Sequence, residues 1–473
     1  MVPENGRLSL NQRVVRALAL MLAVVASLGE ADAQSKAPPT PAQDSPCRVE
    51  AADYKGWHAQ QLSNRWVQLI IVAQNGGRLM QVTFAGHPFF FVNSKYAGKY
   101  LSPDPSQWFN YGGDKIWLLP EGNDDEQHWP GGSDLLDDGP YSFRKISEGQ
   151  QCEIELTSPA DPQSGIQFVR TIRLDADAPQ IRFHVAMKNT TGHDLVWSMQ
   201  SVSQYDTSDP GSPSRLNRDF RAFTPVNPSS SYLNSYHVRY GPAENRSVSV
   251  RDDGLFVLKY SHVANELWLD STAGWVAVVD GNSRFAMVER FRYEEGKPYP
   301  GKASVIFWTN GADLRVNADG MPSLSSGEAG DTPFYMEAEI NSPLCHLRPG
   351  ESCNLDTEWF PTRGGEVQAV KDAGMVEQAL RAKAGKDGKL LLTGAFGVFF
   401  PGRLIAYLYN EHGRSTQKIP VAEVDPADPV KLDVSLAPPG TPARVSLHLE
   451  DRNGLDRGSL QEVTVEKEGS GVQ

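Results

Sequence analysis

The sequence predicts an all-β protein, with one large antiparallel β domain followed by a small C-terminal β-sandwich. Between residues 60 and 360, runs of strand length rich in β-branched and aromatic residues recur with turn residues between them. Glycine (42) and proline (33) are abundant and scattered, as in chains with many turns. A helical period of 3.6 is absent from this region, and short strands at this density are typical of a sandwich or barrel.

The N-terminus has the features of an export signal. Three arginines precede an apolar run at 17–28, and Ala31-Asp-Ala33 has the small residues of a signal-peptidase site. The run is shorter than the roughly 20 apolar residues that a membrane span needs, and no later stretch approaches that length. We therefore expect a signal peptide at 1–33, a disordered leader at 34–46, no membrane span in the mature chain, and a periplasmic or secreted location.

Charge and motifs argue against several classes of protein. The formal net charge is −13 at pH 7 and no basic cluster compensates it, so we expect no nucleic-acid partner. Phosphate-binding loops and Ser or Cys nucleophile motifs are absent, and no cofactor is expected. One acidic run offers oxygens to calcium but lacks the D-x-D-x-D-G pattern, which favours a solvated loop without a metal. The run comprises Glu121, Asp124, Asp125, Glu126, Asp134, Asp137 and Asp138.

The four cysteines suggest two disulfides. Cys345 and Cys353 are symmetric about Arg-Pro-Gly-Glu at 348–351. If this is the turn of a hairpin, opposed Cα atoms lie about 4.5–5.5 Å apart, which a disulfide can bridge. Cys47 and Cys152 then remain to pair, tying the mature N-terminus to an early strand, and export permits both bonds. Four reduced cysteines are the alternative, and a zinc site is disfavoured because no C-x-x-C pair exists.

The large domain is predicted at 47–365. Its strands are separated by turns such as Asn75-Gly-Gly77. Residues 206–250 are rich in Ser, Pro, Asn and Asp, and predict a long excursion with little core of its own. The predicted strands are 65–72, 78–84, 88–92, 152–156, 166–174, 181–187, 195–205, 255–260, 275–280, 285–292, 303–309 and 334–340.

A connector is predicted at 366–387. Apolar residues from Val367 to Leu380 recur there at intervals of three and four, which indicates a partly helical segment. Strand patterns then resume, and we expect a small β-sandwich domain at 388–473. Its predicted strands are 390–399, 403–409, 430–436, 443–450 and 461–465.

The stretch from Trp108 to Trp129 has the residue types of a sugar site. Three of the ten tryptophans fall in it, with an Asn, a Gly pair and charged residues between them. A sugar ring stacks on an aromatic face while polar side chains bind its hydroxyls. A loop packed on the sheet by its own aromatics is the alternative. The predicted ligand-binding residues here are Trp108, Asn110, Asp114, Lys115 and Trp117, and His128 is the candidate acid by its side-chain type.

Five segments carry a resemblance to a known family. They are Asn75-Gly-Gly-Arg-Leu-Met80, Asn110-Tyr-Gly-Gly-Asp-Lys115, Arg182–Trp197, Tyr335–Pro343 and Leu347-Arg-Pro-Gly-Glu351. Together they resemble segments of galactose-mutarotase-like (aldose 1-epimerase-like) proteins, most closely an uncharacterised domain-of-unknown-function branch. The resemblance covers residues 60 to 360. It implies a β-supersandwich, in which two large curved antiparallel sheets present a carbohydrate cleft on the concave face.

The resemblance also implies an activity. Such mutarotases open a sugar ring with a His general acid and a Glu general base. The resemblance implies that the late-strand Glu is Glu337 or Glu339, and Glu339, which borders Ile340-Asn341, is the preferred candidate. At the positions that should hold the His, the chain has Ser201-Val-Ser203, and no His occurs between 194 and 236. An aldose epimerase-like isomerase therefore requires a substitute acid, for which His128 is the candidate.

Strand periodicity adds further charged candidates. Glu337 and Glu339 share one strand face, and their repulsion should raise one pKa, as acid–base catalysis needs. Glu289 and Arg290 alternate faces, so only one of them can line a cleft. Arg78 follows a Gly pair and is within reach of a carboxylate or a hydroxyl. For each, a strand charge that faces water is the alternative.

These observations support three functions. The first is an exported carbohydrate-binding protein. The second is a sugar-active enzyme, either an epimerase or a lyase or hydrolase that uses a carboxylate. The third is a structural or interaction module without sugar binding, whose C-terminal sandwich docks a protein partner.

Overall fold

The predicted all-β fold is confirmed. The computed structural model describes residues 46–104, 106–122, 128–131, 134–243, 247–312, 314–316, 322–324, 332–385 and 387–467. The signal peptide at 1–33, the leader at 34–46 apart from Pro46, and Asp124 to Glu126 lie outside these ranges. Apart from two short 3-10 helices, η1 (Ser94–Tyr96) and η2 (Pro300–Lys302), the described elements are strands. None of the described helices is long and apolar enough to span a membrane.

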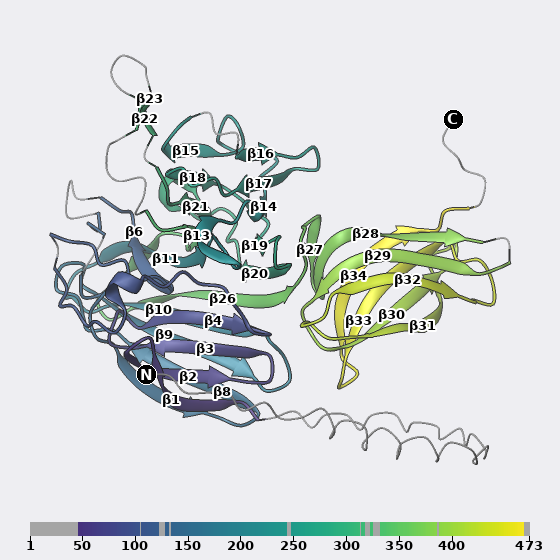
Figure 1. Ribbon diagram of the computed structural model, residues 1–473, viewed down its shortest axis with the longest axis horizontal. Coiled ribbons are helices and arrows are strands. Elements are labelled where there is room, and N and C mark those ends of the chain that lie inside the picture. The colour runs from purple at the N-terminus through teal and green to yellow at the C-terminus, as the bar shows by residue number, and fades with distance from the viewer. Residues whose placement is uncertain are drawn as a thin grey trace, which may run out of the picture. The chain divides into compact units, whose positions relative to one another are not determined.

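Two large antiparallel sheets form the main body (Figure 1). Within the described residues, the first has twelve strands: β1 (Arg48–Tyr54), β2 (Trp57–Ser63), β3 (Val67–Val72), β4 (Arg78–Phe84), β6 (Asp114–Leu119), β11 (Leu195–Asp206), β24 (Tyr335–Asn341), β21 (Val305–Thr309), β18 (Asn265–Leu269) and β15 (His237–Tyr240) in spatial order, with β5 (His87–Pro88) on β4 and β25 (Cys345–Leu347) on β11. The second sheet has ten strands among the described residues. In spatial order they are β16 (Val248–Val250), β17 (Leu255–Lys259), β14 (Phe220–Pro225), β19 (Trp275–Asp280), β20 (Phe285–Phe291), β26 (Ser352–Arg363), β10 (Ile181–Asn189), β9 (Ile166–Asp175), β8 (Gln151–Thr157) and β7 (Ser142–Ser147).

Alternation along the strands places the core between the sheets. In β9, every second residue from Ile166 to Leu174 is buried. Apolar side chains of both sheets, such as Ile71 of β3 and Phe168 of β9, belong to one buried cluster. Burying a side chain of this size stabilises the fold by about 1.5–3 kcal/mol. This burial decides which face of each strand points into the core and which points outward.

Both predicted disulfides are present, and each joins the two large sheets. Cys47 precedes β1 of the twelve-stranded sheet and is bonded to Cys152 in β8 of the ten-stranded sheet. Cys345 lies in β25, which pairs with β11, whereas its partner Cys353 lies in β26 of the other sheet. The predicted turn at 348–351 is present, with Glu351 N donating to Arg348 O at 3.0 Å. The expectation of a paired hairpin is wrong, because the chain changes sheet at this turn.

The prediction of a coreless excursion at 206–250 needs correction. The segment contains β14, which lies inside the ten-stranded sheet between β17 and β19, and Ala222 and Phe223 are fully buried. The Ser- and Pro-rich residues around it form the turns and the small β12 (Ser208–Asp209) and β13 (Ser212–Leu216) ladder. The polar composition of the segment as a whole concealed this six-residue strand, whose Phe220, Ala222 and Phe223 are buried. A second small ladder joins β22 (Leu314–Val316) and β23 (Pro322–Leu324).

The partly helical connector is also wrong, because its residues form β27 (Ala369–Lys371) and β28 (Gly374–Ala384). Val376 and Leu380 are both buried, and the pairing of β28 with β29 shifts register twice between Val376 and Arg381. An interval of four residues fits a strand as well as a helix, since both return the side chain to one face, and bulges disturb the period of two.

Two four-stranded sheets make up the C-terminal region within the described residues. One is β27, β28, β29 (Leu390–Val398) and β32 (Val430–Leu436); the other is β31 (Ser415–Val424), β30 (Gly402–Tyr409), β33 (Arg444–Asp451) and β34 (Asp456–Thr464). Their buried residues form a cluster with residues of the ten-stranded sheet, and the rings of Phe360 and Phe399 stack 4.5 Å apart. The main body and this sandwich therefore share apolar surface.

Candidate functional site

A cavity of about 730 Å³ lies on the face of the twelve-stranded sheet that points away from the core. Adjacent strands β6, β11, β24, β21, β18 and β15 contribute to its lining. On β24, Ala338 enters the core while its neighbours Glu337 and Glu339 line the cavity. We name this the glutamate–tryptophan cavity after lining residues Glu121, Glu266, Glu337, Glu339, Trp108, Trp117, Trp268 and Trp308.

Strand register arranges the middle of the cavity in cross-strand rows. Directly opposed side chains on antiparallel strands have Cβ atoms about 4.5–5.5 Å apart. Two carboxylates therefore flank one tryptophan in the first row, and the second row places a third carboxylate beside them. The rows are Glu266–Trp308–Glu337 and Trp268–Ile306–Glu339.

Neighbouring side chains hold these carboxylates in place. Gln200 and Gln204 of β11 donate side-chain hydrogen bonds to Glu339 and Glu337 respectively. The indole N–H of Trp268 donates to Glu266 Oε1 at 2.5 Å. Each carboxylate of the two rows thus has a positioned donor and keeps further lone pairs for a ligand.

Crowding of carboxylates changes their protonation. Burial, followed by the charge of Glu337, raises the pKa of Glu339 well above its usual range. Burial first, and then Glu266 and Glu337, raise the pKa of Glu121 to about 7. The Glu121 residue is exposed, and screening by water weakens this shift in its pKa. Burial likewise raises the pKa of Glu266. A protonated Glu339 provides both a hydrogen-bond donor and an acid.

Trp108 and Trp117 form one end of the cavity. Trp108 is 42% exposed, and its ring centroid is 6.3 Å from that of Trp117. The Lys115 ammonium is buried 3.8 Å from the Trp117 ring centroid and 5.1 Å from that of Trp108, and its Nζ has no hydrogen-bond partner among the described residues. Burial lowers the pKa of Lys115, and the charge of Asp137 opposes this. A cation under the aromatic end orients both rings.

The loop that carries Glu121 is anchored by Trp129. Gly122 N donates to Trp129 O at 2.9 Å, and Trp129 N donates to Pro120 O at 2.9 Å. The Trp129 ring is 1% exposed and belongs to the core, with its indole N–H donating to Asp134 at 2.6 Å. Of the three tryptophans in the predicted sugar stretch, Trp129 is therefore a core anchor, whereas Trp108 and Trp117 line the cavity.

Three predicted ligand-binding residues do not line the cavity, contrary to expectation. Asp114 alternates with Lys115 and so points into the core, where it is paired with Arg170. Glu289 is fully buried and accepts a hydrogen bond from the Tyr205 hydroxyl. Arg78 is fully buried as well, and its Nη2 donates to Asp137 Oδ1 at 2.7 Å and Asp138 Oδ1 at 3.0 Å. Strand alternation turns Asp114 and Glu289 into the core, whereas Arg78 lies on the opposite face of β4 from the core residue Leu79 and is buried there against Asp137 and Asp138.

Two other predicted residues lie near the cavity without lining it. The Asn110 side chain is buried and accepts from Gly112 N at 3.2 Å, which stabilises the glycine turn. His128, the predicted substitute acid, is half-buried beside Trp129. Neither is among the lining residues. The predicted residues that the structure does bring together are Trp108, Trp117, Glu337 and Glu339, with Lys115 beneath the two tryptophans.

Sequence reasoning missed most of the lining residues, including five with large polar or aromatic side chains. A signal for two of them lies in Asn265–Leu269, where Glu266 and Trp268 alternate with buried residues. An acid and a tryptophan on one strand face have the composition that singled out the stretch from Trp108. The five are Gln200, Arg239, Glu266, Trp268 and Trp308.

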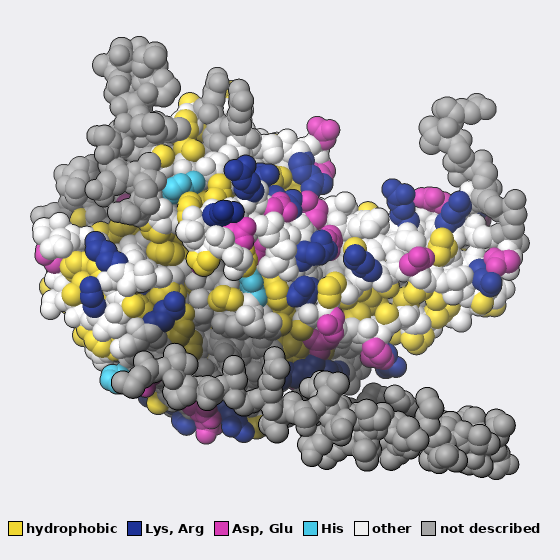
Figure 2. Space-filling model, viewed as in Figure 1, with side chains coloured by type: hydrophobic (Ala, Val, Ile, Leu, Met, Phe, Trp, Pro, Cys, Tyr) yellow, Lys and Arg dark blue, Asp and Glu magenta, His cyan; other side chains and the backbone are white. Residues whose placement is uncertain are grey.

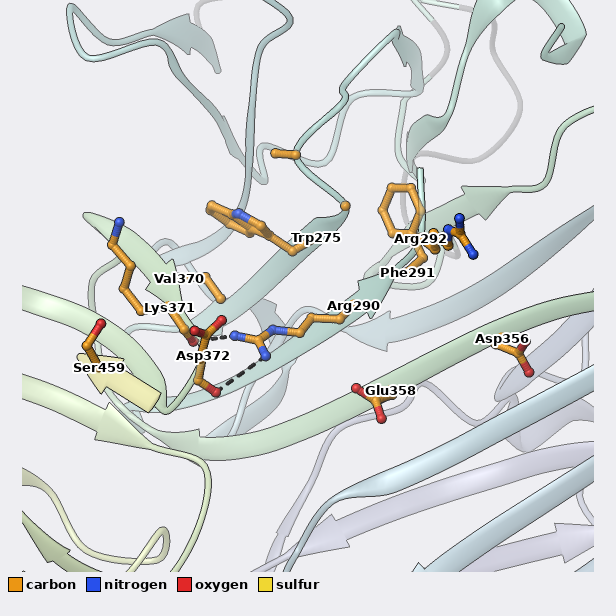
Figure 3. Close-up of a pocket in the computed structure, with 12 residues that line it drawn as sticks. Trp275, Arg290, Phe291, Arg292, Asp356, Glu358, Val370, Lys371, Asp372 and Ser459 are labelled. Atoms are coloured by element: carbon orange, nitrogen blue, oxygen red, sulfur yellow. Dashed lines mark hydrogen bonds between the residues drawn. The ribbon is translucent and has the colours of Figure 1, made fainter. Parts of the chain in front are cut away.

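A second pocket, of about 590 Å³, lies between β19, β20 and β26 of the main body and β27 and β34 of the C-terminal sandwich (Figure 3). The Arg290 guanidinium donates to the carbonyl oxygens of Lys371 and Asp372, so it links the two parts instead of facing a ligand. Trp275 is the single tryptophan of its lining. Basic and acidic side chains are mixed across the visible face of the molecule (Figure 2). This pocket resembles a junction more than a ligand site.

Comparison with known proteins returned structural matches only. No protein-family model and no curated protein matches the chain. A TPR-domain containing protein from Parabacteroides distasonis is 14% identical, with a TM-score of 0.43 over 65% of this chain and 47% of the other. A galactose mutarotase-like protein from Clostridium acetobutylicum is 9% identical, with a TM-score of 0.41 over 67% of this chain and 99% of the other. A putative aldose 1-epimerase from Escherichia coli is 10% identical, with a TM-score of 0.36 over 67% of this chain and 99% of the other. The chain thus spans about half of the first protein and nearly all of the other two.

Proposed function

We propose that the protein is an exported carbohydrate-binding protein whose ligand occupies the glutamate–tryptophan cavity. One observation carries the proposal: four tryptophans and four glutamates line a single cavity on one face of the sheet. Stacking surfaces and positioned hydrogen-bonding groups are the two things that a sugar requires of its site. A volume of about 730 Å³ lies within the range of small-molecule sites.

Charge and targeting support the remaining parts of this proposal. The formal net charge of −13 disfavours nucleic acid, and the lining combines four carboxylates with one arginine, Arg239. A neutral or cationic glycan suits such a lining better than a polyanionic one. The basic, apolar and small-residue pattern at 1–33 supports export, with a periplasmic or secreted location. The C-terminal sandwich remains a candidate surface for a protein partner.

A second candidate function, a sugar-active enzyme, is favoured by Glu339. Burial and the charge of Glu337 raise its pKa well above the usual range, which is the direction that a general acid needs, and Glu337 lies beside it on the same strand face. This pair would serve an epimerase with a substitute acid, or a lyase or hydrolase that uses a carboxylate. His128 would act as the acid only if the ligand reached it outside the cavity lining.

Binding is tested by calorimetry on the mature protein with a panel of hexoses, hexosamines and their oligomers. We expect at least one member to bind at millimolar concentration or better, and Trp308→Ala to weaken that binding several-fold. Trp275→Ala, in the second pocket, is the matched control and should leave affinity unchanged. Absence of binding across the panel by a folded protein contradicts the proposal. Anomer exchange or bond cleavage followed by NMR, in wild type and Glu339→Gln, separates an enzyme from a binding protein.

A further inference from the structure

The glutamate–tryptophan cavity has two aromatic ends. Trp117 of β6 and Trp108 form one end, and Trp308 of β21 and Trp268 of β18 form the other. Strands β11 and β24 lie between β6 and β21 and contribute polar side chains to the floor. These polar residues are Gln200, Glu337 and Glu339.

The spacing of the strands separates these ends by more than one sugar ring can cover. Neighbouring strands lie about 4.8 Å apart, so β6 and β21 are separated by three spacings, roughly 14 Å, and β18 is one spacing farther. Stacking requires heavy atoms within about 4–4.5 Å. A sugar ring stacked on Trp117 therefore cannot also stack on Trp308. Curvature of the sheet does not bring strands that are three spacings apart within stacking distance.

Each aromatic end is held by its own set of contacts. The Trp117 indole N–H donates to Asp137 Oδ1 at 2.8 Å, and the Trp268 indole N–H donates to Glu266 Oε1 at 2.5 Å. At Gly301, an added Cβ would lie 1.8 Å from the Trp268 ring, so the glycine leaves the room that this ring needs. Tyr232 donates its hydroxyl to Gly301 O at 2.5 Å and fixes that loop. Rings oriented in this way cost little entropy when a ligand stacks on them.

We propose that the cavity binds an oligosaccharide of at least two sugar units, with one unit stacked at Trp108 and Trp117 and another at Trp268 and Trp308. The linkage between the units crosses the polar floor formed by Gln200, Glu337 and Glu339. The inference rests on the proposed carbohydrate function and narrows it from sugars in general to oligomers. It also places the carboxylate pair next to a glycosidic bond instead of a free reducing end.

Affinity as a function of chain length tests this inference. Glucose, cellobiose and cellotetraose, galactose and β-1,4-galactobiose, and glucosamine and chitobiose are titrated into the mature protein by calorimetry. We expect an oligomer to bind at least about tenfold tighter than its own monomer, because a second stacked ring adds buried contact that the monomer does not make. Equal affinity for monomer and oligomer overturns the oligosaccharide inference while leaving sugar binding intact. Absence of binding by every probe overturns both proposals.

Variants at the two ends supply the internal control. Trp268→Ala should lower oligomer affinity at least about fivefold and bring it toward that of the monomer, and Trp268→Phe, which keeps a ring, should retain most of the oligomer affinity. The melting temperature of each variant is measured alongside its affinity, so that a folding defect is recognised. If Trp108→Ala and Trp268→Ala each remove monomer binding to the same extent, one ring contacts both ends and the two-unit arrangement is wrong.

Discussion

Glu337 and Glu339 lie two residues apart on the same face of β24, and each accepts a hydrogen bond from a glutamine of the neighbouring strand β11. Glu337 raises the pKa of Glu339 through its charge, in addition to the larger effect of burial. Two carboxylates this close are most stable when they share a proton. The pair therefore presents both an acceptor and a proton to the cavity.

Glu339→Gln should leave the melting temperature near pH 5 almost unchanged, because glutamine has the shape and neutral charge of the protonated acid. Since the folded-state pKa of Glu339 is raised, wild type loses stability as the pH rises through that pKa, and the variant does not. Because the unfolded chain releases its proton first, the variant should melt increasingly higher than wild type as the pH rises from about 5. Thermal melts from about pH 5 to pH 9 measure this, with Glu423→Gln, at an 80% exposed side chain, as control. Equal destabilisation at every pH would contradict the protonated state.

Glu289 gives a sharper pH prediction, because burial raises its pKa from 4.5 to about 8. Its stabilising contribution is complete below about pH 4.5 and is lost as the pH rises through 8, because the unfolded chain releases its proton first. Glu289→Gln should therefore raise the free energy of unfolding by at most a few kcal/mol above pH 8, and change it little near pH 5. Denaturant titrations at both pH values test this. Tyr205→Phe, which removes the donor to Glu289, should destabilise at both.

Trp108 and Trp129 should respond oppositely to truncation. Trp129→Ala empties a core position that is 1% exposed and should cost about 3–5 kcal/mol of stability. Trp108 is 42% exposed, so Trp108→Ala should cost under about 1 kcal/mol and act on ligand affinity instead. Denaturant unfolding and calorimetry on the same two proteins measure both quantities. A large stability loss for Trp108→Ala with unchanged affinity would remove Trp108 from the binding site.

The two disulfides should differ in their effect on stability. Cys47–Cys152 closes a loop with a sequence separation of 105, and Cys345–Cys353 one of 8. Loop-closure entropy predicts losses of about 4.7 and about 2.5 kcal/mol when each is replaced by a pair of serines. Denaturant midpoints of the two double variants under oxidising conditions test the order. A larger loss for Cys345→Ser/Cys353→Ser would show that the chain crossing between sheets matters more than loop length.

Truncation after residue 365 tests the predicted domain boundary. The C-terminal sandwich covers buried residues of the ten-stranded sheet, and the Thr362 hydroxyl donates to Val398 O at 2.8 Å. Removing residues 366–473 should expose this apolar surface, lower the melting temperature and promote self-association. Size-exclusion chromatography and thermal melts of the truncated and mature chains measure both effects. A monomeric truncated protein with an unchanged melting temperature would establish two independent domains.

Much of the fold was predictable, because alternation within a strand depends only on local sequence. The predicted 78–84, 275–280 and 430–436 coincide with β4, β19 and β32. Strands β1, β2, β6, β18 and β31 were among those not predicted. The misread segments hold β14, which polar neighbours concealed, and β28, whose bulges disturb the period of two. The cysteine pairs followed from spacing. Their role in joining the two sheets did not, since the sequence around 348–351 shows a turn and not a change of sheet.

The candidate site was only partly predictable. Alternation placed Glu337 and Glu339 on one face, and this is what the structure shows. The same reasoning makes Asp114 and Lys115 point in opposite directions, but it does not say which of the two enters the core. Glu266, Trp308 and Glu337 are neighbours only because β18, β21 and β24 pair in this register. That register is set by burial of the opposite face, which involves residues from the whole chain.

The sequence by itself determined an all-β chain, its main strands, two cysteine pairs and an aromatic stretch suited to sugars, because each depends on residue type and short-range spacing. The tertiary structure decided which side of each strand became cavity and which became core. It turned Asp114 and Glu289 into the core, buried Arg78 against Asp137 and Asp138, and brought Glu266, Trp268 and Trp308 to the aromatic stretch. The physical reason is that pairing between strands distant in sequence is selected by the packing of the whole core, and no local pattern contains that information.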